Sequence, residues 1–168
     1  MYYGNIKNYD IADGEGVRVT LFVSGCRHHC EGCFQPQTWD FDYGQPFTDA
    51  TKAYIFKLLS NDLIQGFTCL GGEPFEPENQ EVLAPMLKEM KEKFPDKDIW
   101  CYTGYTYDTD LMPGGSVRTE YTEDMLKAID ILVDGEFVLA LKDLTLKFRG
   151  SSNQRMLHLV DGKVVKID

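Results

Sequence analysis

The chain has 168 residues, of which 43% are hydrophobic and 26% charged, and its formal net charge at pH 7 is −10. This length and composition are typical of one globular domain, and the acidity argues against nucleic acid as a partner because that polyanion would be repelled. No segment approaches the roughly 18 apolar residues of a membrane helix, and the first residues, MYYGNIKNYD, carry no export signal, so we expect a single cytoplasmic domain over 1–168 without membrane attachment.

Seven segments of the sequence carry the periodicity of strands or helices, in alternation. Strands are expected at 17–25, 66–72, 98–104 and 130–135, and helices at 49–61, 77–94 and 121–129. This alternation predicts a mainly parallel sheet covered by helices. Because the loops after parallel strands meet at one edge of a sheet, we expect four motifs on one rim, namely SGCRHHCEGCF, GGEP, TGYTYD and DGEF.

Local signals mark the ends of several of these elements. Thr48 or Asp49 is the expected N-cap of the first helix, and Thr122 that of the third. Pro85 lies within the second expected helix, where it should kink the helix or delay its start. Near the end of the chain, Asp161-Gly162 separates two alternating apolar runs, which predicts a C-terminal β-hairpin.

Three of the five cysteines lie close together. An odd number of cysteines in an expected cytoplasmic chain argues against a disulfide framework. Cys26, Cys30 and Cys33 follow the first expected strand, and thiolates select zinc, copper(I) or iron–sulfur clusters. Three thiolates on a four-iron cluster leave one iron open, and an open metal position can bind a small molecule. The spacing therefore favours a cluster whose missing fourth ligand marks the place of the chemistry.

Two other interpretations of this loop are compatible with its residues. A structural zinc site could add His28 or His29 to the three thiols, although such sites usually combine two separated ligand pairs. Three buried, inert thiols are the other possibility. We expect no catalytic role for either histidine. Cys69 and Cys101 lie inside expected strands and are predicted to be small core residues.

Larger parts of the sequence resemble known families. The loop SGCRHHCEGCF resembles the Cx3Cx2C motif of radical S-adenosylmethionine (SAM) enzymes, and GGEP resembles the glycine-rich motif after their second strand. The segments DGEGVRVTLFVSGC, GQPFT, DIWCYTGY, ILVDGEF and RGSSNQR resemble the activating proteins of anaerobic ribonucleoside-triphosphate reductase. This resemblance implies an α/β fold of the radical SAM type, an incomplete parallel β/α barrel followed by the C-terminal hairpin. An open barrel suits a substrate that is a loop of another protein.

The resemblance also implies cofactors, partners and chemistry. Cys26, Cys30 and Cys33 would hold a [4Fe-4S] cluster, and the open iron would bind S-adenosylmethionine. Reductive cleavage would give a 5′-deoxyadenosyl radical, which takes a hydrogen atom from a glycine loop in the large subunit of the reductase. A flavodoxin- or ferredoxin-type protein would donate the electron. The alternatives are another radical SAM enzyme acting on a different glycyl-radical protein or a small molecule, a zinc-bound interaction module, and a simple electron carrier.

Two short segments are expected to contact S-adenosylmethionine. Two adjacent glycines would let the backbone approach its methionyl part, and the glutamate after them would accept a charge-assisted hydrogen bond from its ammonium group. An aromatic ring after the third cysteine would pack on adenine, although burial of that ring in the core is an alternative. The expected cofactor-binding residues are Gly32, Cys33, Phe34, Gly71, Gly72 and Glu73.

The roles of three further motifs stay open. Thr103, Tyr105 and Tyr107 end the third expected strand and could line the cofactor cavity. Asp134 could lie near the cofactor, or it could only satisfy the hydrogen bonds of the loop that follows it. The segment 149–155 is rich in hydrogen-bonding groups, and its resemblance to the family favours a role in cofactor or partner binding.

Overall fold

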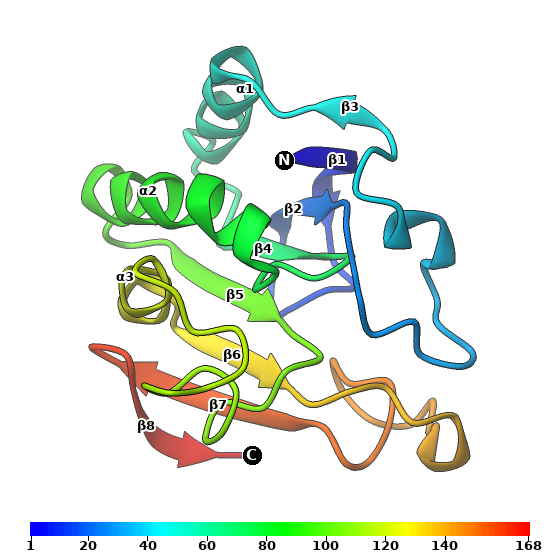
Figure 1. Ribbon diagram of the computed structural model, residues 1–168. Helices are drawn as coiled ribbons and strands as arrows, with labels where there is room; N and C mark the ends of the chain where they lie inside the picture. Colours follow the sequence, from blue (N-terminus) through cyan, green and yellow to red (C-terminus); the bar gives the residue numbers. More distant parts are fainter.

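The chain forms one sheet of eight strands with three α-helices (Figure 1). The computed structural model describes residues 1–168. The strands are β1 (Tyr2–Asp10), β2 (Arg18–Val23), β3 (Gln45–Pro46), β4 (Gly66–Gly71), β5 (Asp98–Tyr102), β6 (Ile131–Asp134), β7 (Arg155–Val160) and β8 (Lys163–Ile167). The helices are α1 (Asp49–Leu59), α2 (Pro77–Lys93) and α3 (Thr122–Ala128), with the short 3-10 turns η1 (Pro36–Trp39) and η2 (Leu139–Leu141).

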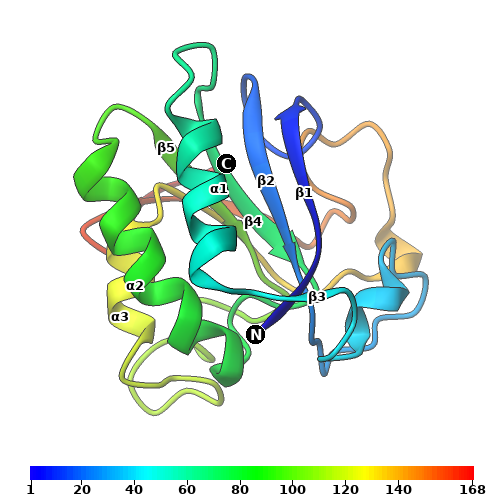
Figure 2. The ribbon, with the colours of Figure 1, turned by 90° about the horizontal axis from the view of Figure 1, so that it is seen from above.

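The centre of the sheet is parallel and its margins are antiparallel. The strand order is β3-β1-β2-β4-β5-β6-β7-β8, in which β2, β4, β5 and β6 run parallel. These are the four strands expected from the alternation. The helices α1, α2 and α3 lie on one side of the sheet (Figure 2), because each right-handed connection leads to the next strand in the same direction.

The margins of the sheet differ from the expectation. The sequence did not predict β1 or β3, and the pairings of β1, β3, β7 and β8 are antiparallel. The strand β1, YYGNIKNYD, is largely polar and half exposed, and its register against β2 shifts twice, so it carries no clean alternation. The prediction of a mainly parallel sheet is therefore correct for the centre and wrong for the margins.

Most of the predictions about the ends of the helices are confirmed. The Thr48 hydroxyl accepts the Thr51 amide, and the Thr51 hydroxyl accepts the Thr48 amide, which makes a capping box at α1. The expected cap of α3 is wrong, because Thr122 is its first helical residue and Tyr121 occupies the cap position. The helix α2 runs through Pro85 from its expected start.

The C-terminal hairpin is confirmed. Its two strands, β7 and β8, pair antiparallel and are joined by Asp161 and Gly162, which have φ angles of 52° and 78°. Two consecutive positive φ values are the geometry of a type I′ turn, whose twist matches that of the flanking strands. Because β7 also pairs with β6, the hairpin extends the sheet beyond its parallel centre.

The two faces of the central strands have different surroundings. Cys69 and Cys101 are register partners on β4 and β5 and are fully buried in the core under the helices, which confirms that they are core residues. Phe22 and Tyr102 point to the opposite side and line a cavity there. The sheet is open, since β3 and β8 are its two edges, as an incomplete barrel requires. None of the helices combines the length and the apolar character needed to cross a bilayer.

Candidate functional site

A cavity of about 530 Å³ lies on the open side of the sheet. The cysteine loop after β2 lines it, together with Gly71–Glu73 after β4, Thr103 and Gly104 after β5, and Gly135 after β6. All of these segments follow the carboxyl ends of parallel strands. The expectation that the four motifs share one rim is therefore confirmed.

Backbone groups lie around the sulfurs of the cysteine loop. Cys26 is buried, whereas Cys30 and Cys33 are partly exposed, and all three line the cavity. The Gln35 amide donates to Cys33 Sγ at 3.4 Å. The backbone at His28 and His29 acts to lower the pKa of Cys26, and the backbone at Phe137 acts to lower the pKa of Cys30. N–H donors of this kind stabilise thiolates and tune the potential of a cluster that they hold.

The cysteine loop is fixed against the segment that follows it. The Gly25 amide donates to the Thr38 carbonyl at 2.8 Å, and the Cys26 amide donates to the Trp39 carbonyl at 3.2 Å. Gly25 has a φ of 100°, a left-handed conformation that favours glycine. These contacts hold the start of the loop, so the position of Cys26 does not depend on a ligand.

Without a metal, the environment keeps the Cys26 and Cys30 thiols protonated. Burial, together with the carboxylates of Glu73 and Glu76, raises the pKa of Cys26 to about 12. Burial likewise raises the pKa of Cys30, with a further contribution from Glu136. Thiolates in this acidic surrounding therefore require a cationic centre that offsets the negative charge, as a bound metal does.

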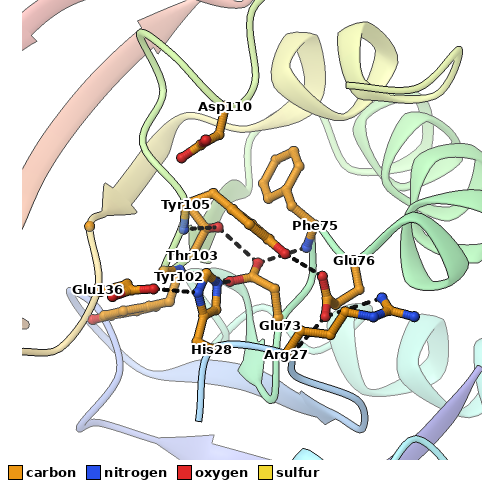
Figure 3. Close-up of polar contacts among 12 residues, drawn as sticks. Arg27, His28, Glu73, Phe75, Glu76, Tyr102, Thr103, Tyr105, Asp110 and Glu136 are labelled. Atoms are coloured by element: carbon orange, nitrogen blue, oxygen red, sulfur yellow. Dashed lines mark hydrogen bonds and ion pairs between the residues drawn. The ribbon is translucent and has the colours of Figure 1, made fainter. Parts of the chain in front are cut away.

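Glu73 is almost fully buried, and its carboxylate receives donors on both oxygens (Figure 3). Its Oε1 accepts the Gly104 amide at 2.7 Å and lies 2.9 Å from His28 Nε2. Its Oε2 accepts the Phe75 amide and the Thr103 hydroxyl, both at 2.8 Å. A ligand ammonium, as expected from the sequence, would have to share Oε1 with these protein donors.

Glu76 ties the cysteine loop to the start of α2 (Figure 3). It is fully buried, and it accepts the Arg27 amide at 2.8 Å and the Tyr105 hydroxyl at 2.5 Å. The Arg27 guanidinium lies 3.3 Å from the same carboxylate and also pairs with Glu78 on the surface. Glu76 was not among the expected site residues, because a carboxylate next to a helix start is usually solvated.

His28 bridges three of the rim loops and was not expected to do so. Its Nε2 lies 2.9 Å from Glu73, its Nδ1 lies 2.9 Å from Glu136, and its ring packs on Tyr105 with the centroids 4.3 Å apart. Burial opposes protonation of His28, but the two carboxylates outweigh it and raise its pKa to about 9. The neighbouring loops are thus joined through one imidazole.

The zinc interpretation of the cysteine loop lacks a fourth ligand. Both ring nitrogens of His28 are engaged by carboxylates, and the ring of His29 stacks on Trp39 with the centroids 4.4 Å apart. No group of three or more His, Cys, Asp or Glu side chains is arranged to hold a single metal ion. The thiolates of a four-iron cluster bind different irons and stand farther apart than the ligands of one ion, so the loop suits a cluster better than zinc.

Gly71 and Gly72 are needed for a close backbone contact. Gly71 has a φ of 131°, and a Cβ there would lie 2.4 Å from the Val23 carbonyl oxygen. A Cβ on Gly72 would lie 2.8 Å from the Gly25 carbonyl oxygen. The glycines therefore let the GGEP loop pack against the start of the cysteine loop. Both also line the cavity, and their approach to a methionyl group stays a prediction.

Phe34 lies at the surface beside the cavity, so the alternative that it belongs to the core is wrong. Its side chain is 57% exposed. The ring packs at a tilt against Phe137 with the centroids 5.1 Å apart, and the Lys142 ammonium lies 5.2 Å from its centroid. Phe34 and Cys33 both line the cavity. The packing of adenine on Gly32, Cys33 and Phe34 stays a prediction.

The segment 149–155 forms one wall of the cavity. Arg149, Gly150 and Gln154 line it. The Gln154 side chain accepts the Gly150 amide at 2.8 Å and donates to the Gly135 carbonyl at 3.0 Å, which fastens this segment to the loop after β6. This location agrees with the role in cofactor or partner binding that the resemblance favours, and that role stays a prediction.

The Asp134 carboxylate lies close to this cavity and is held by donors of the protein. Arg155 donates to its carboxylate at 2.9 Å and 2.6 Å, and the Tyr107 amide donates at 2.8 Å. These contacts support the interpretation that Asp134 satisfies hydrogen bonds of the neighbouring loops. Of the three residues expected at the end of the third strand, only Thr103 lines the cysteine cavity, whereas Tyr105 holds Glu76.

A carboxyl pair lies at the other end of the cavity, in the turn between β1 and β2. Burial and the adjacent Asp10 together raise the pKa of Asp13 to about 7. Burial also acts to raise the pKa of Asp10, but hydrogen bonds from Asp13, the Ala12 amide and the Thr20 hydroxyl lower it overall. The pair therefore shares a proton near neutral pH.

Arg18 anchors the same turn from inside the sheet. It is fully buried, and it donates to the Thr68 hydroxyl at 2.7 Å and to the Glu15 carbonyl at 2.8 Å. Its guanidinium also lies 2.6 Å from the Asp98 carboxylate and over the ring of Trp100. These partners neutralise the buried charge and fix the turn beside the cavity.

Known proteins resemble this chain over nearly its full length. Residues 12–157 match the family model described as a 4Fe-4S single cluster domain. The chain is 44% identical to the anaerobic ribonucleoside-triphosphate reductase-activating protein of Pasteurella multocida, over 92% of this chain and 95% of the relative. It is 40% identical to the proteins of the same name from Enterobacteria phage T4, over 96% and 97%, and from Escherichia coli K12, over 95% and 99%.

Proposed function

We propose a function on the premise that this chain belongs to the family of anaerobic ribonucleoside-triphosphate reductase-activating proteins. In this proposal the protein is a radical SAM activase that generates a glycyl radical on the large subunit of that reductase. It works in the cytoplasm, and a flavodoxin- or ferredoxin-type protein supplies its electron.

The observation that carries the proposal is the set of three cysteine sulfurs at one cavity. Cys33 Sγ accepts the Gln35 amide, and the GGEP loop lines the same cavity. The remaining thiols, Cys69 and Cys101, are buried in the core under the helices, so they do not reach the cavity as a fourth ligand. A cluster held by Cys26, Cys30 and Cys33 would therefore keep one iron open toward the cavity.

When both cofactors are bound, the [4Fe-4S] cluster supplies one electron that cleaves S-adenosylmethionine to methionine and a 5′-deoxyadenosyl radical, which takes a hydrogen atom from the substrate glycine. The chain itself orients and shields these groups. Glu73 would accept from the methionyl ammonium once His28 or Gly104 shares its Oε1, which already has two donors. Phe34 and the backbone at Gly32 and Cys33 would hold the adenine.

The open sheet supports a protein substrate. In our proposal the sheet is an incomplete barrel of the radical SAM type, with β2, β4, β5 and β6 as its parallel strands. Because β3 and β8 do not close the sheet, the cavity between the loops stays open to the partner. A loop of a large partner can enter such an opening, whereas a closed barrel admits mainly small molecules.

The test is anaerobic reconstitution of the purified protein with iron and sulfide. We expect about four irons and four sulfides per chain, release of 5′-deoxyadenosine on reduction with S-adenosylmethionine, and a glycyl radical detected by electron paramagnetic resonance (EPR) when the reductase is added. The variants Cys26→Ala, Cys30→Ala and Cys33→Ala should lose all three signals. Cys69→Ala is the matched control and should keep them.

Different failures of this test have different meanings. A colourless protein with one zinc and no sulfide would refute the iron–sulfur proposal. Release of 5′-deoxyadenosine without a radical on the reductase would refute the proposed substrate and favour another radical SAM enzyme that acts on a different protein or a small molecule.

A further inference from the structure

An apolar ridge stands at the mouth of the cysteine cavity. It is formed by the turn after β6 and by the ring that follows the third cysteine. Its members are unusually exposed for large apolar side chains, namely Phe34 (57%), Val138 (37%), Leu139 (42%), Leu141 (43%) and Leu144 (85%). We call these five residues the rim ridge. In both ribbon views, η2 lies on the same side of the molecule as the cysteine loop, away from the helices (Figures 1 and 2).

Contacts between the two segments make the rim ridge one surface. A Cβ on Gly32 would lie 2.8 Å from a methyl carbon of Leu139, so the turn packs directly on the cysteine loop. Phe34 packs against Phe137, which precedes the turn. Phe34 and Leu144 both border the cavity. Exposed apolar side chains gathered in this way mark an interaction site more often than a surface that stays in water.

The charge around the rim ridge differs from that of the whole chain. The segment 137–150 carries three cationic side chains and one carboxylate, whereas the chain as a whole has a net charge of −10. These groups are Lys142, Lys147, Arg149 and Asp143. A partner that docks here would therefore present an apolar patch with acidic neighbours, since the rest of this protein would repel such a surface.

We propose that the rim ridge is the surface on which the large reductase subunit docks, with an apolar and acidic face of that subunit seated around its glycine loop. This inference rests on the proposed function, which requires a partner's backbone to reach this cavity. The ridge adjoins the opening that the glycine must enter, and its cations supply the charge complementarity. Phe34 is the one ridge residue that is also expected to contact a cofactor, so variants at the other ridge residues separate docking from cofactor binding.

The experiment compares ridge variants with matched controls in direct binding to the purified reductase. The variants are Leu144→Ser and Lys147→Glu, alone and combined, in the reconstituted holoprotein. The controls are Leu63→Ser, which is 74% exposed in the turn before β4, and Lys163→Glu on the C-terminal hairpin. We expect the combined variant to bind the reductase at least about tenfold more weakly, and the controls to bind like the wild type.

Two further readouts separate docking from catalysis. Iron content and 5′-deoxyadenosine release without reductase should stay unchanged in the ridge variants, and a higher reductase concentration should restore glycyl-radical formation. Added salt should weaken wild-type binding more than binding of Lys147→Glu, because exposed charges are screened.

The possible failures are distinct. Equal binding of ridge variants, controls and wild type overturns the docking surface and leaves the proposed function standing. A wild-type protein that binds the reductase through the ridge but forms no glycyl radical refutes the proposed function instead. A change from dimer to monomer in the ridge variants, with reductase binding intact, would show a contact between two copies of this chain and would also overturn the proposal.

Discussion

Removal of the Glu76 carboxylate should detach the cysteine loop from the start of α2. In Glu76→Ala, the Arg27 amide and the Tyr105 hydroxyl lose their acceptor inside the protein. A hydrogen bond to a charged group contributes about 1.5–3 kcal/mol, so two of them predict a loss of about 3–6 kcal/mol in the free energy of unfolding. This is a large part of the roughly 5–15 kcal/mol that holds a domain folded.

The same arginine provides the matched control. Arg27 also pairs with Glu78, whose side chain is 47% exposed, whereas Glu76 is 0% exposed. Because exposed ion pairs contribute only about 0–1 kcal/mol, Glu78→Ala should change the free energy of unfolding by less than about 1 kcal/mol. Arg27→Ala keeps the backbone amide that Glu76 accepts, so it should cost far less than Glu76→Ala.

The assay is chemical denaturation of each variant under anaerobic conditions, together with iron content per chain. Because Arg27 follows Cys26 directly, Glu76→Ala should also retain less iron than Glu78→Ala after gel filtration. Equal stability and equal iron retention in the two variants would refute the reasoning, since the buried hydrogen bonds would then not hold the loop.

Three further variants test other parts of the structure. The pKa of Asp13 is raised from 3.8 to about 7 in the folded protein. The protonated side chain therefore contributes fully to the stability of the fold below about pH 4, and this contribution is lost as the pH rises through 7. Asp13→Asn can still donate to Asp10 and should therefore gain about 1–2 kcal/mol at pH 8 and almost nothing at pH 4, by denaturation at both pH values. Arg18→Ala leaves Asp98 without its buried partner and should cost about 3–5 kcal/mol, and a loss below 1 kcal/mol would contradict this. Gly162→Ala places a side chain at a φ of 78° and should lower the stability by about 1 kcal/mol in thermal denaturation, with no effect on iron content.

The sequence predicted the part of the fold that follows from local periodicity. The four parallel strands, the three helices and the Asp161-Gly162 turn each have a pattern that is complete within a short window. The strand β1 was missed because its residues are polar and half exposed and its register is irregular. Its pairing with β2 depends on a contact between distant parts of the chain that no local pattern records.

The candidate site also has a part that local motifs predicted and a part that depends on contacts between distant residues. The cysteine spacing and the GGEP motif placed the cavity correctly because each lies in one loop after a strand. The network through His28, Glu73 and Glu76 joins loops from distant parts of the chain, so most of their partners were not visible in the sequence. The glycines before Glu73 singled out that carboxylate, whereas nothing beside Glu76 distinguishes it from the many other carboxylates of the chain.

The cavity wall formed by 149–155 is completed later during synthesis of the chain than the cysteine loop. The cysteines lie near the beginning of the chain, whereas this wall can stand only after β7 has paired with β6. A nascent chain on the ribosome therefore exposes its thiols to the cell well before it can shelter a metal centre. The shelter around the cysteines is complete only once β7 has paired with β6, so a variant that disrupts β7 should expose the cavity even though every cysteine is present.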